Sequence, residues 1–115
     1  MVLPKGYLYL AVAILAEVVA TSALKASEGF TRPLPSLLVA LGYGTSFYFL
    51  SLTLKTVPVA VAYAIWSGVG ILLITLAAMV LYKQVPDLAA VLGMALIVAG
   101  VAVLMGFSRL GGLVH

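Results

Sequence analysis

Long apolar runs separated by short polar breaks dominate the chain. Four of these runs hold about twenty residues each, the length that an α-helix needs to cross the hydrocarbon core of a bilayer. They cover residues 6–24, 34–54, 58–82 and 88–107. The pattern predicts an all-α membrane protein with four transmembrane helices per chain, in which residues 1–115 form a single transmembrane domain.

The breaks between the runs contain residues that end or start helices. Lys25–Pro33 includes Gly29 and ends in a proline, and Pro58 suits the first turn of the third helix. Asp87 follows a proline and is a candidate N-cap for the fourth helix. Connections this short place consecutive helices side by side and antiparallel.

Composition excludes most other classes of protein. The chain is 65% hydrophobic and 8% charged, with a mean hydropathy of +1.30, and a soluble domain of this length cannot bury that much apolar surface. It has no cysteine and one histidine, His115, so we expect no metal and no cofactor. Without a nucleophile–base pair or a phosphate-binding loop, we expect no enzyme. The charges lie singly at the span ends, so we expect no nucleic-acid partner.

The basic residues divide evenly between the two sides of the membrane. They are Lys5, Lys55 and Arg109 on one side, and Lys25, Arg32 and Lys83 on the other. The excess of Lys and Arg in cytoplasmic loops normally sets orientation, and here neither side has an excess. Either a weak bias is hidden, or the chain inserts in both orientations.

Glu17 is the only charged side chain inside a predicted span. A charge at this depth costs roughly 2.5–3.5 kcal/mol on insertion scales, so such groups are usually functional. Ala13 and Thr21 lie one turn away on the same helix face, where small side chains leave space beside the carboxylate. The alternative is a protonated carboxyl group that only donates a hydrogen bond between helices.

Aromatic residues lie at a similar depth. Tyr43 and Trp66 are near the midpoints of their spans, and Tyr63 lies one turn from Trp66 on the same face. Aromatic faces attract organic cations, most strongly when water is excluded. Together with a carboxylate they indicate a site for a lipophilic cation, whereas taken alone they are equally consistent with packing. Tyr7 also fits an ordinary interfacial position.

Two groups of glycines stand out. Gly68-Val69-Gly70 lies in mid-span and permits either a bend or close packing by small residues. In the fourth span, Gly93 and Gly100 are seven residues apart, and Ile97 extends the same seam. This spacing predicts a contact between two helices, so assembly is the expected role of the fourth span.

Several motifs together resemble one family, the small multidrug resistance transporters. They are Ile14–Val18 (ILAEV), Ser27–Arg32 (SEGFTR), Ala62–Gly70 (AYAIWSGVG), and Gly93-Met94 with Ala99–Val101. The match covers all four spans in order. The resemblance implies an antiparallel homodimer of eight helices in the bacterial inner (cytoplasmic) membrane, which agrees with the even division of basic residues.

The resemblance also implies a function and roles for individual residues. The chain would be a proton-coupled antiporter that exports lipophilic aromatic or quaternary cations by alternating access, with protons and drug competing for Glu17. The implied substrate pocket consists of Tyr43, Tyr63, Trp66, Tyr7, Ala13 and Thr21. The implied helix kink is at Gly68, Val69 and Gly70, and the implied dimer contact is at Gly93, Ile97 and Gly100.

Three alternatives stay open. Guanidinium exporters of the same family typically carry a tryptophan shortly after the first-span glutamate, where this chain has Val18-Val19-Ala20, so the multidrug branch is favoured. A proton-carrying subunit of a rotary ring also combines apolar helices with one central carboxylate. A structural or lipid-handling membrane protein could use Glu17 only to hold helices together.

Overall fold

The computed structural model describes residues 5–107, and four α-helices follow one another within this range, with no strand. They are α1 (Lys5–Ala26), α2 (Pro33–Thr53), α3 (Val59–Tyr82) and α4 (Leu88–Phe107). Each is long and apolar enough to cross a membrane. The predicted all-α chain with four membrane-spanning helices is therefore confirmed. Arg109 and His115 lie outside the described residues.

The connection between α1 and α2 is a tight turn. Glu28, Gly29 and Phe30 have positive φ angles of 48°, 71° and 67°, in the left-handed region that favours glycine. Ser27 is fully buried, and its hydroxyl group donates to the Leu24 carbonyl (2.7 Å) and accepts from the Phe30 amide (3.2 Å). This one side chain therefore satisfies backbone groups on both sides of the reversal.

The segment between α3 and α4 ends one helix and caps the next. α3 ends at Tyr82, and the following residue, Lys83, has a left-handed conformation. The next amide, of Gln84, donates to the Ala78 carbonyl (3.2 Å). The Asp87 carboxylate accepts a hydrogen bond from the Ala90 amide (2.8 Å), so the predicted N-cap of α4 is present.

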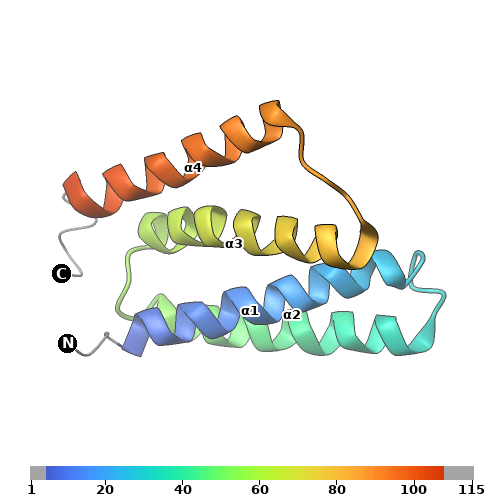
Figure 1. Ribbon diagram of the computed structural model, residues 1–115. Coiled ribbons are helices and arrows are strands. Elements are labelled where there is room, and N and C mark those ends of the chain that lie inside the picture. Colours follow the sequence, from blue (N-terminus) through green and yellow to red (C-terminus); the bar gives the residue numbers. More distant parts are fainter. Residues whose placement is uncertain (1–4, 108–115) are drawn as a thin grey trace.

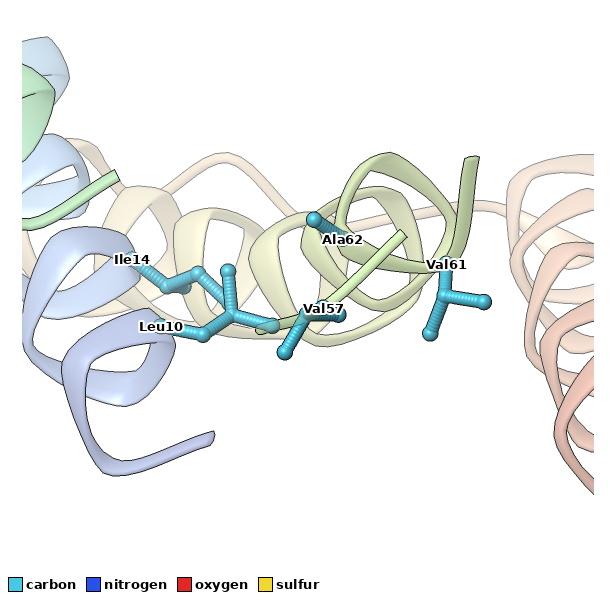
Figure 2. Packing of buried hydrophobic residues seen from close by; sticks show 5 residues of the cluster. All are labelled: Leu10, Ile14, Val57, Val61 and Ala62. Carbon is cyan, nitrogen blue, oxygen red and sulfur yellow. The ribbon is translucent and has the colours of Figure 1, made fainter. Parts of the chain in front are cut away.

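α1 contacts two other helices of the described chain. It packs against α2 along much of its length and against α3 on another face, whereas α4 packs against α3 (Figure 1). The main buried cluster lies where α1 meets the segment that enters α3, and it consists of Leu10, Ile14, Val57, Val61 and Ala62 (Figure 2). α1 is thus held on two sides, which fixes the position of Glu17.

The outer surface of the described chain is strongly apolar. Leu34, Val80 and Leu96 have exposed fractions of 69%, 73% and 73%, and none of the residues of α4 whose burial is described is buried. A water-soluble monomer rarely exposes contiguous apolar surface on this scale. The surface fits lipid tails or a second protein chain.

Candidate functional site

Glu17 lies on α1 and is partly buried between neighbouring helices. The Thr21 hydroxyl, one turn further along α1, donates a hydrogen bond to Glu17 Oε1 (2.9 Å). Thr21 Oγ1 also lies 2.7 Å from the Tyr43 hydroxyl on α2. A threonine hydroxyl has one proton, and Thr21 gives it to Glu17, so Tyr43 donates to Thr21. The three residues form a directed hydrogen-bond chain from α2 to the carboxylate.

A cavity of about 330 Å³ opens beside the carboxylate. It is formed by α1, α3 and α4, and its lining consists of Glu17, Thr21, Trp66, Ser67, Gly70, Ile71, Ile74 and Ile97. One acid, two hydroxyl groups and an indole therefore face an otherwise apolar space. This is the expected chemistry of a site that binds a lipophilic organic cation.

Two larger cavities lie between α3 and α4, with volumes of about 540 and 700 Å³. Both are lined almost entirely by apolar side chains, and neither lining includes an acid. Size alone would favour them. We place the site at the smaller cavity because it contains the carboxylate and the indole.

Gly70 shapes the cavity by lacking a side chain. A Cβ atom at this position would lie 3.3 Å from Trp66 Cδ1 and 3.9 Å from Trp66 Nε1. The edge of the indole ring therefore lies directly against the backbone of the next turn. Gly68 faces α4, since a Cβ atom there would lie 3.0 Å from Val101 Cγ2 of that helix. The two glycines permit two different close contacts, and α3 is helical through residues 68–70.

The structure brings some of the predicted pocket residues together and separates others. Thr21 and Trp66 line the Glu17 cavity, and Tyr43 reaches it through Thr21. Ala13 is fully buried, and its carbonyl accepts a hydrogen bond from Ser46 on α2 (2.8 Å), so it belongs to the α1–α2 contact. Tyr63 is 60% exposed on the surface of α3.

Tyr7 lies near the start of α1, away from the cavity lining. Its hydroxyl oxygen is buried and has no hydrogen-bond partner among the described residues. Of the predicted dimer-contact residues, Gly93 and Gly100 have open space where a side chain would be. Ile97 is 41% exposed and also lines the Glu17 cavity.

The sequence did not single out Ser67, Ile71 or Ile74 as cavity residues. A signal for them was present: Ser67, Ile71 and Ile74 are separated by four and then three positions, and such spacing places residues on one helix face. Trp66 and Gly70 lie directly beside this face. Choosing that face over the others requires knowledge of where α1 packs.

The fold and the site define a multi-pass membrane protein with one ionisable group facing an apolar cavity. The profile of the Small Multidrug Resistance protein family matches residues 5–97. The chain belongs to this family. Membership confirms the resemblance read from the motifs, and it confirms that the chain is a transporter of this kind and not an enzyme.

Individual relatives match over nearly their whole length. The quaternary ammonium compound-resistance protein QacE of Escherichia coli is 58% identical over 105 residues, which are 91% of this chain and 96% of QacE. The multidrug transporter PA4990 of Pseudomonas aeruginosa is 58% identical over 107 residues, covering 93% and 97%. The multidrug transporter EmrE of Escherichia coli K12 is 50% identical over 103 residues, covering 90% and 94%.

Proposed function

We propose that the protein is a proton-coupled antiporter that exports lipophilic aromatic or quaternary cations by alternating access, across the bacterial inner membrane. The observation that carries the proposal is the placement of Glu17, the only acid in the four spans, in one cavity with Trp66. The names of QacE, PA4990 and EmrE, which refer to quaternary ammonium resistance or multidrug transport, support the same conclusion.

Coupling follows from the chemistry of one shared carboxylate. A protonated Glu17 has no charge with which to hold a cation, and a Glu17 paired with a cation has no proton. Protons that enter from an acidic exterior therefore displace the drug, and drug from the cytoplasm displaces protons. Exchange requires only that the protonated protein release its proton on the cytoplasmic side and that the drug-bound protein release the drug on the exterior side.

Aromatic groups supply affinity for the organic part of the substrate. The Trp66 indole faces the cavity, and the Tyr43 hydroxyl is held near it by Thr21. A cation over an aromatic face gains about 0.5–2 kcal/mol, with the larger values where water is excluded. In this proposal the exposed ring of Tyr63 completes the pocket from the surface of α3 when a second chain covers it.

The Glu17 cavity of a single chain is small for this function. Its volume of about 330 Å³ is near the lower limit of drug-sized pockets. The proposed active form is an antiparallel homodimer in which two oppositely inserted copies share one pocket. Exchange of conformations between the two copies then converts an inward-open state into an outward-open one, as inverted repeats do in larger transporters.

The multidrug subtype is preferred over guanidinium export. The positions after Glu17 are Val18-Val19-Ala20, without the tryptophan that guanidinium exporters typically carry. A ring subunit needs only a two-span hairpin, whereas this chain has four spans. A purely structural role for Glu17 does not require a cavity beside it.

The decisive experiment is ethidium binding to the purified protein across a range of pH. In the wild type we expect binding to weaken as the pH falls, because protonation removes the negative charge. Glu17→Gln should lose this binding by at least about 100-fold, since a neutral amide cannot replace a charge in an apolar cavity. Glu28→Gln and Asp87→Asn, which change the only other acids of the chain, are matched controls that should bind as the wild type does.

Proton-competed ethidium binding by Glu17→Gln would refute the proposal. A ring of many subunits in native membranes would instead support the rotary-ring alternative. Normal insertion of Glu17→Gln, shown by its accumulation in the membrane, separates loss of binding from loss of folding.

A further inference from the structure

α2 lies directly against the backbone of α1 at Gly42. A Cβ atom at this position would lie 2.8 Å from Ala20 Cβ, 3.0 Å from the Ala16 carbonyl oxygen and 3.2 Å from Ala20 Cα. Two of these three atoms belong to the backbone of α1, so no rotation of a side chain could relieve the contact. Any residue larger than glycine requires the two helices to separate.

This contact between α1 and α2 lies next to the hydrogen-bond chain of the site. Each of its three residues immediately precedes one member of that chain along the sequence: Ala16 precedes Glu17, Ala20 precedes Thr21, and Gly42 precedes Tyr43. One turn beyond, the buried Ser46 hydroxyl donates to the Ala13 carbonyl (2.8 Å) and fixes the same register of α2 on α1. The spacing of the two backbones therefore sets the distance between Tyr43 on α2 and Thr21 on α1.

The distances leave little tolerance. Ordinary contacts between carbon atoms are about 3.5–4.0 Å, so a methyl group at Gly42 would push the helices apart by roughly 1 Å. The oxygen atoms of Tyr43 and Thr21 are 2.7 Å apart, and a hydrogen bond is lost when such a distance exceeds about 3.5 Å. The hydrogen bond between Thr21 and Glu17 lies within α1 and does not depend on this separation.

We propose that Gly42 is a positioning residue of the cation site. It holds the Tyr43 hydroxyl within hydrogen-bond distance of Thr21, the residue that donates to Glu17. The inference rests on the proposed function of Glu17 and adds a residue of α2 that touches neither the cavity nor the carboxylate. Because Gly42 acts only through Tyr43, its effect must disappear when the Tyr43 hydroxyl is absent.

The test is a double-mutant cycle read by ethidium binding at one fixed pH. Gly42→Ala should weaken binding about fivefold to tenfold, the value of about one hydrogen bond to a polar site. Tyr43→Phe should weaken it by a similar factor, and Gly42→Ala should add no further loss in the Tyr43→Phe background. Gly44→Ala is the matched control, since Gly44 is exposed on α2 and a Cβ atom there would meet nothing within 4 Å.

Two results would overturn the inference. One is a Gly42→Ala protein that binds ethidium as Gly44→Ala does. The other is a double variant Gly42→Ala/Tyr43→Phe whose loss of ethidium affinity equals the product of the two single losses. That result would indicate a general defect of packing that does not act through Tyr43. Glu17→Gln is measured in parallel: if it retains proton-competed binding, the proposed function fails whatever Gly42→Ala does.

A compensating variant keeps the test valid if Gly42→Ala accumulates poorly in the membrane. Ala20→Gly removes the nearest of the three opposing atoms, so the double variant Gly42→Ala/Ala20→Gly should recover part of the lost binding. The cycle with Tyr43→Phe can be repeated in this background.

Discussion

Thr21 is the residue that joins the two polar groups of α1 and α2. Its hydroxyl donates to Glu17 and accepts from Tyr43, and a valine of nearly the same shape can do neither. We expect Thr21→Val to weaken ethidium binding about tenfold, because the carboxylate loses a donor and the Tyr43 hydroxyl is left unpaired. Thr21→Ser, which keeps the hydroxyl, should bind within about twofold of the wild type. Equal binding by the two variants would show that the hydrogen-bond chain does not contribute.

Individual residues of the site could be singled out from the sequence where a side chain is of a type rarely found at that depth in a membrane. Glu17 stands out because a charge in a span is costly, and Trp66 stands out because indoles normally lie at the membrane interface. Gly42 could not be found in this way. A glycine in an apolar helix has no anomalous chemistry of its own, and its role depends on which face of α1 it meets.

At the scale of elements, the two glycines of α3 serve different neighbours. Gly70 leaves room for the Trp66 indole, and Gly68 leaves room for Val101 of α4. The chain has one tryptophan, so its intrinsic fluorescence reports on Trp66 alone. Gly70→Ala should shift the emission maximum and weaken ethidium binding severalfold, since the indole must move by a few tenths of an ångström.

Gly68→Ala is the matched comparison for this prediction. Its added methyl group contacts α4, so the emission maximum should remain close to that of the wild type even if the stability of the α3–α4 contact falls. A shift with Gly68→Ala and none with Gly70→Ala would contradict the assignment. Shifts of equal size in both variants would instead favour the predicted helix kink as their shared role.

The helices themselves were almost fully predictable, and their arrangement was not. Run length, the breakers at Gly29, Pro33 and Pro58, and the N-cap at Asp87 give the bounds, because the bilayer fixes the length of a span and these residues fix its ends. Which face of each helix meets its neighbour depends on the fit of small residues, as at Ala20 and Gly42. In an apolar chain hydrophobic periodicity does not mark that face, since lipid and protein neighbours are equally apolar.

At the scale of the whole molecule, α4 is the most exposed of the four described helices. None of its residues whose burial is described is buried, and Gly93 and Gly100 have open space where side chains would be. If this seam contacts a second copy, Gly93→Leu and Gly100→Leu should each convert dimers to monomers in analytical ultracentrifugation, because the larger side chain separates the two backbones. Gly106→Leu is the matched control, since Gly106 lies about 120° around the helix from Gly100. Equal loss of dimer in all three variants would rule out a specific seam.

If the proposed antiparallel dimer is the active form, forcing the chain into one orientation should abolish its activity. Arg32→Gln/Lys83→Asn removes two basic residues from one side of the membrane, and Lys5→Gln/Lys55→Gln removes two from the other; asparagine is chosen at position 83 because it tolerates the left-handed conformation found there. Each variant then has a three-to-one excess of Lys and Arg and should insert in one orientation only. Either variant alone should fail to confer ethidium resistance on cells, whereas their co-expression should restore it, because only the mixture supplies oppositely oriented partners. Full resistance from one variant, together with a reporter that shows a single orientation, would exclude the antiparallel arrangement and leave the Glu17 site itself intact.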